Sequence, residues 1–347
     1  MKKITIKDVA EYAGVSITTA SFALNNITDR VNAQTQEKVL KAAKELGYIA
    51  NVNAAKLRSN ETNSIMLVYS QVFLEEQNAN ITQFISSTIK AAKQFHKDVI
   101  IKSFHPYDNW DKMIQSYSRI WISRKVDGII FLCATDDNVP DYVFSKLYNE
   151  HNVNLVIAGS PNRMHKDEKR DFPTVYDDLY SATYNALNKI ISKGYEEIFY
   201  LGMNYDNFYP IRFRSYLDFI KNNQTTGKLL TYDTVYRTNN DIWNLIQPII
   251  KNQEKDIAFM CWNDIDAISV LELIALNAPN RQHRIGVMGY DNISTAAHTV
   301  PSLTTIQNPY EEIAKLCVSL VCKQINMRSP IAPNIIVDAE LIERDSL

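Results

Sequence analysis

Two short helical patterns joined by a glycine turn occupy residues 5–25. In the first pattern, apolar side chains recur every three or four residues, which places them on one face of a helix. These side chains are Ile6, Val9, Ala10 and Ala13. Gly14 can adopt the left-handed conformation that ends a helix, and Ser16 can cap the start of the next helix. The pattern therefore predicts two short helices connected by a tight turn.

The second helix has two different sides. Its inward side is apolar and consists of Ala20, Ala23 and Leu24. Its outward side carries Ile17, Thr18, Ser21, Phe22 and Asn25. A helix-turn-helix places such an outward side in the major groove of DNA. The spacing alone fits a plain helical hairpin equally well, so both interpretations are open at this stage.

A third helix and a short hinge follow within the first 60 residues. Asn32 can cap this helix, and Gly47 can end it. Its expected inward side chains are Val39, Leu40, Ala43 and Leu46. The next segment, residues 48–58, reads YIANVNAAKLR. The helix-turn-helix pattern, the third helix and this hinge segment follow one another along the chain. Together they closely resemble the head of the lactose-repressor (LacI/GalR) family of transcription regulators.

The resemblance implies a DNA-binding head over residues 1–60, in which residues 51–58 form a hinge helix in the minor groove. The residues expected at the DNA are Thr5, Ser16, Ile17, Thr18, Thr19, Ser21, Phe22, Asn25, Asn51, Ala54, Leu57 and Arg58. It also implies a homodimer on a near-palindromic operator, because two-fold protein symmetry mirrors two-fold symmetry of the DNA site.

Charge is divided unevenly along the chain. Residues 1–60 hold nine Lys or Arg against five Asp or Glu, whereas the remainder holds 28 against 34. A basic head on an acidic body favours phosphate contact by the head alone. No apolar run approaches the ~20 residues that span a bilayer, and no signal-peptide pattern follows Met1. We therefore expect a cytoplasmic protein without membrane contact.

The body, residues 61–347, alternates between strand-like and helix-like segments. This alternation predicts an α/β fold with parallel sheets, and the resemblance implies a two-lobed body like that of periplasmic binding proteins. The expected first lobe is residues 62–160 with 293–322, and the expected second lobe is residues 161–292 with 323–347. Ligands of such lobes bind at the carboxyl ends of the strands, which predicts a cleft between the lobes.

Three segments of the second lobe resemble the family's effector-site motifs. Residues 212–216, RFRSY, resemble R-x-x-G-[YF], with Ser215 in place of the usual glycine. Residues 259–264, FMCWND, end a predicted strand with Asn-Asp, and residues 286–291, GVMGYD, resemble VVG[FY]D. Residues 301–306, PSLTTI, resemble the crossover into the first lobe. The implied effector-binding residues are Arg212, Asn263, Asp264 and Asp291, with Phe73, Tyr236 and Trp262 as candidate aromatic contacts.

These side-chain types suit a polyol such as a sugar. Arginine offers a rigid fork of donors, aspartate accepts from hydroxyls, and asparagine does both. Each residue also has a purely structural interpretation: Asn263 and Asp264 as helix caps, Asp291 in a turn, and Arg212 in an ion pair. Together they indicate a repressor of a carbohydrate-use operon whose operator affinity is changed by a small ligand.

Other functions differ in what they require of the chain. A regulator controlled by a phosphoprotein partner fits, because residues 77–82, QNANIT, lack the Asn-Pro-Phe-Phe-like turn of relatives. A sugar-binding transport receptor would share the body but not the basic head.

The four cysteines lack CxxC spacing and the six histidines are scattered, so we expect no metal and no cofactor. GxSxG, GxxxxGK[ST] and HExxH motifs are absent, so we expect no enzyme.

Overall fold

The computed structural model describes residues 4–25, 28–48, 62–71, 80–105, 109–133, 139–159, 170–203, 211–233, 237–252, 255–327 and 333–347. The chain forms two compact units, Met1–Thr62 and Asn63–Leu347. Within the described ranges, no helix is both long enough and apolar enough to cross a membrane.

The described residues of the first unit form three capped α-helices and a short 3-10 turn. They are α1 (Ile6–Tyr12), α2 (Ile17–Leu24), η1 (Thr28–Arg30) and α3 (Ala33–Glu45). Thr5, Ser16 and Asn32 cap the three α-helices, each through a side-chain oxygen that accepts a backbone N–H. Gly14 lies at φ +61°, the left-handed conformation predicted for the end of α1. The local signals therefore define where these helices start and stop.

Small apolar side chains from all three helices form the core of this unit. They are Val9, Ala10, Ala13, Ala20, Ala23, Val39, Ala42 and Ala43. Alanine lets helices approach closely, so the core is compact despite its few atoms. Leu40, expected to face inward, is 45% exposed. The prediction was wrong there because Leu40 follows Val39 directly, and adjacent residues of a helix point about 100° apart.

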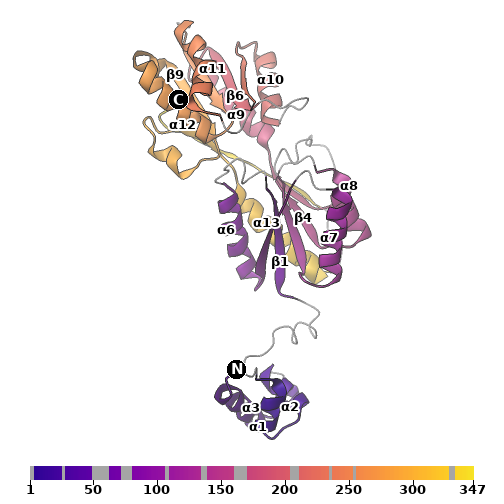
Figure 1. The fold of residues 1–347 in the computed structure, drawn as a ribbon. Coiled ribbons are helices and arrows are strands. Elements are labelled where there is room, and N and C mark those ends of the chain that lie inside the picture. Colours follow the sequence, from indigo (N-terminus) through magenta and orange to yellow (C-terminus); the bar gives the residue numbers. More distant parts are fainter. Residues whose placement is uncertain are drawn as a thin grey trace. The chain divides into compact units, whose positions relative to one another are not determined.

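The first lobe of the second unit is built on a six-stranded parallel sheet (Figure 1). Its strands, in spatial order, are β11 (Asn334–Val337), β5 (Thr174–Asp177), β4 (Leu155–Ala158), β3 (Gly128–Leu132), β1 (Ser64–Ser70) and β2 (Asp98–Phe104). Most inner strands are apolar on both faces, as expected for a parallel sheet covered on both sides.

Helices cover both faces of this first sheet. One face packs against α6 (Asn80–Gln94) and α13 (Tyr310–Met327). The other face packs against α7 (Trp110–Ile122), α8 (Asp141–Ser145) and the π-helical segment η2 (Lys146–Glu150). The helical stretch 141–150 is divided between the α-helix α8 and the π-helical segment η2. The result is a three-layer lobe with two apolar cores.

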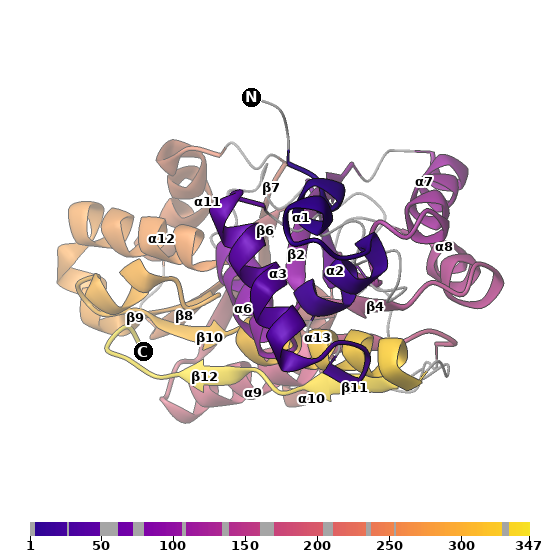
Figure 2. The same ribbon diagram turned by 90° about the horizontal axis from the view of Figure 1, so that it is seen from below.

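The second lobe repeats this architecture around another six-stranded sheet (Figure 2). Its strands, in spatial order, are β12 (Glu340–Ile342), β10 (Thr304–Gln307), β9 (Ile285–Tyr290), β8 (Ile257–Cys261), β6 (Glu197–Met203) and β7 (Leu229–Tyr232). All pairs are parallel except β10 with β12. The fold class predicted from the sequence, an α/β body with two mainly parallel sheets, is confirmed.

Helices also cover both faces of the second sheet. One face packs against α11 (Asn239–Asn252) and α12 (Asp264–Asn277), and the other against α9 (Leu179–Ser192) and α10 (Ile211–Asn223). Short 3-10 turns, η3 (Pro279–Arg284) and η4 (Ser294–His298), flank β9. Because β6, β8 and β9 run parallel, their carboxyl ends lie at one edge of the sheet. The loops and the first turns of the helices that follow these strands lie at the same edge.

The chain crosses between the two sheets three times, at places that differ from the predicted lobe boundaries. Strand β5, placed by prediction in the second lobe, pairs with β4 in the first sheet. Strand β10 pairs with β9 in the second sheet, so the PSLTTI segment precedes the crossover instead of forming it. The extended run 334–342 is divided between the sheets, because β11 pairs with β5 and β12 with β10. Strand pairing is non-local, and a segment pattern does not determine it.

Candidate functional site

Helix α2 exposes most of the face expected to contact DNA. Ile17 is 50% exposed, and Thr5, Ser16, Thr18 and Asn25 are also exposed. Thr19 and Phe22 are half-buried, and Phe22 is not among the described side chains that pack against the core of this unit. An accessible, largely uncharged helix face of this kind can approach base edges in a major groove. The expected hinge residues Asn51, Ala54, Leu57 and Arg58 lie outside the described residues.

Ser21 does not share this exposed face. Ser21 is only 3% exposed, so the expectation that it points outward was wrong. Ser21 directly follows the buried Ala20 and lies three residues before Leu24, which places it at the edge of the inward side. Asn25 closes this end of the helix by donating its side-chain N–H to the Ser21 carbonyl at 2.7 Å. Ser21 therefore belongs to the packing of α2.

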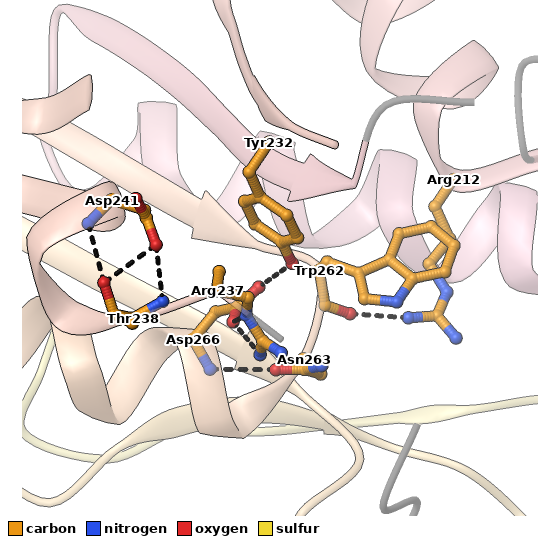
Figure 3. A network of polar contacts seen from close by, with 8 residues as sticks. All are labelled: Arg212, Tyr232, Arg237, Thr238, Asp241, Trp262, Asn263 and Asp266. Carbon is orange, nitrogen blue, oxygen red and sulfur yellow. Dashed lines mark hydrogen bonds and ion pairs between the residues drawn. The ribbon is translucent and has the colours of Figure 1, made fainter. Parts of the chain in front are cut away.

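In the second unit, Arg212 is the centre of a cluster of polar and aromatic residues at the carboxyl edge of the second sheet. Arg212 lies in the first turn of α10 and is 9% exposed. Its guanidinium carbon lies 3.7 Å from the Tyr290 ring centroid and 4.6 Å from that of Trp262. Its Nη1 donates to the Trp262 carbonyl at 2.7 Å, and Figure 3 shows the indole beside the guanidinium. Two aromatic faces thus hold the cation in place.

Two carboxylates complete what we call the Arg212 cluster: Arg212, Trp262, Tyr290, Asp177 and Asp291. Asp177 ends β5 of the first sheet, whereas Asp291 follows β9 of the second. Burial raises the pKa of Asp177 to about 6 and that of Asp291 to about 7, although Arg212 lowers both. The cluster therefore combines groups from both lobes, as a ligand site between lobes requires.

The Asp291 carboxylate is tied to the crossover between the lobes. Its Oδ1 accepts a hydrogen bond from Asn308 Nδ2 at 2.7 Å, and its backbone N–H donates to the Ile306 carbonyl at 2.7 Å. Asp291 has a φ of +111°, a conformation that residues other than glycine rarely adopt. Such backbone strain persists only where surrounding bonds enforce it, and it occurs preferentially at functional sites.

Several buried polar atoms around Arg212 have no hydrogen-bond partner within the described part of the chain. They are Arg212 Nε, Tyr290 Oη and Tyr200 Oη. A buried donor left without a partner costs roughly 1–3 kcal/mol. A hydroxyl-rich ligand at this place would supply acceptors and donors for these atoms.

Asp264 and Asn263 have structural roles. Asp264 is fully buried, and its two oxygens accept hydrogen bonds from Thr305 Oγ1 at 2.5 Å and from the Ile293 N–H at 2.8 Å. A side chain at Gly289 would collide with Asp264 Oδ1, so this glycine makes the close approach possible. The expectation that Asp264 contacts an effector does not fit this burial. Its carboxylate joins α12 to β10 and to the turn before η4.

Asn263 is the N-cap of α12 and accepts the Asp266 N–H at 2.8 Å. It is half-buried and directly follows Trp262. Ser215, the departure from the family motif, is fully buried inside α10 and donates its hydroxyl to the Tyr180 carbonyl at 2.8 Å. The serine therefore fits a regular helix without an unsatisfied polar group. The predicted aromatic contacts Phe73 and Tyr236 lie outside the described residues.

Sequence reasoning did not identify Asp177 and Tyr290 as members of the Arg212 cluster, nor Asn308 as the residue that holds the Asp291 carboxylate. Asp177 belongs to no recognisable motif, and its neighbour Asp178 has a structural role as the N-cap of α9. Asn308 carries no recognisable motif. Asp177 follows Val175 and Tyr176 in the four-residue strand β5, which was not predicted, and Asn308 follows the polar residue Gln307 at the end of β10.

The described residues contain no group of three or more His, Cys, Asp or Glu that could hold a metal ion. All four cysteines are buried free thiols. The groups that this site presents, namely hydrogen-bonding side chains, aromatic surfaces and one guanidinium, are suited to reversible binding of a ligand.

We predict that the raised pKa values make the stability of the body depend on pH. The pKa of Asp291 rises from 3.8 to about 7 through burial, so the folded state holds a proton there that the unfolded state has lost. This contribution to stability is complete below about pH 4 and is lost as the pH rises through 7. Urea unfolding should show that Asp291→Asn loses about 2 kcal/mol less stability than wild type between pH 5 and pH 8. Parallel stability curves for the two proteins would contradict the assignment.

Two family models match the chain. Residues 5–51 match the model of bacterial regulatory proteins of the lacI family, and residues 187–347 match the model of a periplasmic binding protein-like domain. The chain belongs to the LacI family.

Relatives of this LacI-family chain are similar over its whole length. It is 26% identical to the HTH-type transcriptional regulator RegA of Clostridium saccharobutylicum, covering 99% of this chain and 98% of RegA. It is 28% identical to the HTH-type transcriptional repressor PurR of Erwinia tasmaniensis, covering 99% of this chain and 96% of PurR. The crystal structure of the Lac repressor dimer bound to operator and the anti-inducer ONPF has a TM-score of 0.78 at 19% identity, covering 99% of both chains. This LacI-family protein is a DNA-binding transcriptional regulator, as are the relatives named.

Proposed function

We propose that this protein represses transcription, and that a small polyhydroxyl ligand, a sugar, changes its operator affinity by binding at the Arg212 cluster. The observation that carries the proposal is the meeting of Asp177 from the first sheet with Arg212 and Asp291 from the second. A ligand that contacts both lobes binds their different relative positions unequally. Unequal binding is the requirement for a ligand to shift a conformational equilibrium.

The chemistry of the cluster supports a hydroxyl-rich ligand. Carboxylates at Asp177 and Asp291 accept hydrogen bonds from hydroxyls, and Arg212 Nε donates one. The Trp262 ring offers an apolar face of the kind that packs against the C–H face of a sugar ring. An operon for carbohydrate use is the corresponding target.

The experiment that tests this function is titration calorimetry of the full-length protein against a panel of sugars. Binding of one of them, lost in Arg212→Ala, would support the proposal. Binding that survives unchanged in Arg212→Ala would contradict the assignment of the site. A phosphoprotein that binds when no sugar does would favour the alternative regulator controlled by a protein partner.

We also propose that the protein binds a near-palindromic operator as a homodimer, and that α6 and β2 form part of the contact between subunits. Strand β2 is an edge strand, and Ile101 on it is 43% exposed. Val99 packs on the core beneath α6, so the two-residue period places Ile101 on that same face of the sheet. On α6, Ile89 is 47% exposed. A second copy of the chain would cover this apolar surface.

Wild-type protein should therefore be a dimer in light scattering, and Ile101→Lys should raise the dimer Kd by at least about a hundredfold, since burial of an unpaired ammonium costs several kcal/mol. Ile122→Lys is the matched control, because Ile122 is 71% exposed on α7, which covers the opposite face of the sheet. Equal dimer stability of the two variants would contradict the proposed interface.

A further inference from the structure

A second arginine at the carboxyl edge of the second sheet is bound to a buried carboxylate. Asp266, in the first turn of α12, is fully buried. Arg237 Nε donates to Asp266 Oδ1 at 2.6 Å, and Arg237 Nη2 contacts the same oxygen. Tyr232 Oη, at the end of β7, donates to Asp266 Oδ2 at 2.5 Å. We call these three residues the Asp266 triad, which Figure 3 shows.

The triad is connected to the Arg212 cluster through a short piece of chain. The backbone N–H of Asp266 donates to Asn263 Oδ1 at 2.8 Å. Trp262 directly precedes Asn263, and its carbonyl accepts a hydrogen bond from Arg212 Nη1. Arg237 and Arg212 therefore approach the residues that follow β8 from two different elements (Figure 3). The Arg237 side chain is only 13% exposed and is therefore largely covered by protein.

The start of helix α11 also fixes the position of Arg237. The next residue, Thr238, caps α11: its N–H and its hydroxyl both donate to Asp241 Oδ2, at 2.7 and 2.8 Å. The Tyr232 ring also lies 5.2 Å from the Arg237 guanidinium carbon. A guanidinium held by a buried carboxylate, an aromatic face and a capped helix has little freedom to turn toward a ligand.

These contacts determine the balance of charge at the proposed ligand site. Asp266 compensates the positive charge of Arg237. Arg212 is the cation of the Arg212 cluster, and it faces the two carboxylates Asp177 and Asp291. Both faces of its guanidinium are covered by rings, and its Nη1 is bonded to the Trp262 carbonyl. At pH 8, above the raised pKa values of both acids, the two carboxylates Asp177 and Asp291 therefore face one cation in this cluster.

We propose that this site selects an uncharged, hydroxyl-rich ligand over the phosphate ester of the same ligand, and that Asp266 sets this selectivity by holding Arg237. The inference rests on the proposed function, and it names the class of ligand. A phosphate group carries a charge of about −1.5 to −2 at pH 7 and needs several donors. Here it would meet two carboxylates, whereas hydroxyls can donate to those same carboxylates.

The first test uses the wild-type, full-length protein and matched pairs of ligands. Glucose, maltose and cellobiose are titrated calorimetrically beside the 6-phosphate ester of each. We expect an uncharged member to bind and its ester to bind at least about thirtyfold more weakly. An ester that binds as tightly as its parent sugar would overturn the inference while leaving the proposed function intact. No binding by any uncharged sugar or ester would contradict both.

The second test changes the triad. Asp266→Asn keeps the side-chain shape but removes the charge that compensates Arg237, so the preference for the uncharged sugar should fall at least about tenfold. The double variant Asp266→Leu with Arg237→Met removes both charges together and should keep the wild-type preference. Circular dichroism checks that each variant is folded. A folded Asp266→Asn protein with the wild-type preference would overturn the role of Asp266, and so would loss of that preference in the double variant.

Discussion

Replacing Ile17 with aspartate should weaken operator binding roughly a hundredfold, because the new carboxylate would repel DNA phosphates and remove an apolar contact to the bases. Ile17 is the first residue of α2 and is 50% exposed, so the substitution leaves the core of the head unchanged. Fluorescence anisotropy with a labelled operator measures the effect.

The head provides a matched control for this substitution. Leu40 on α3 is 45% exposed, so Leu40→Asp introduces the same charge at a similar exposure on another helix. The control should lose much less affinity, since its charge acts through the general field and not at a base edge. Equal losses in the two variants would show that α2 has no special role and would contradict the helix-turn-helix assignment.

Replacing Arg212 with alanine should abolish the effect of the sugar on operator binding while leaving operator binding itself intact. Couplings of this kind are worth about 1–3 kcal/mol, so the response that disappears is a change of roughly 5–150-fold in operator affinity. Arg212 is packed between Trp262 and Tyr290, and its loss removes the guanidinium that a ligand would contact. Asp291→Ala should have the same effect, whether the sugar releases the operator or strengthens its binding.

Lys221→Ala is the control for this pair, because Lys221 is exposed in the last turn of the same helix α10. This variant should retain the full response to sugar. If Arg212→Ala and Asp291→Ala both retain it as well, the ligand binds elsewhere, and control by a partner protein becomes the better explanation.

The head was predictable from sequence because its signals are local. Thr5, Ser16 and Asn32 are caps that lie next to the helices they start, and Gly14 has the backbone conformation that its position demands. The errors at Ser21 and Leu40 arose at the borders of helix faces. At a border, burial depends on which neighbouring helix covers the residue, and a periodic pattern does not contain that information.

The body was predictable at the level of elements, but not at the level of sheet membership. The body alternates between strands and helices as the sequence pattern predicted, whereas β5 and β11 pair within the first sheet from distant parts of the chain. The same limit explains the site. Arg212 and Asp291 were identified through motifs, while Asp177 joins them only because β5 ends beside the second lobe. Asp264 matched a motif, yet its carboxylate is used for packing.

The most direct test of the central claim, coupling between the ligand site and DNA binding, is to measure the Kd of the same sugar twice. Calorimetry gives this Kd for the free protein and for the protein bound to operator. Thermodynamic linkage requires the two values to differ by the same factor by which the sugar changes operator affinity. We predict a difference of roughly 5–150-fold, lost in Arg212→Ala. Equal dissociation constants for the free and operator-bound wild-type protein would contradict the account.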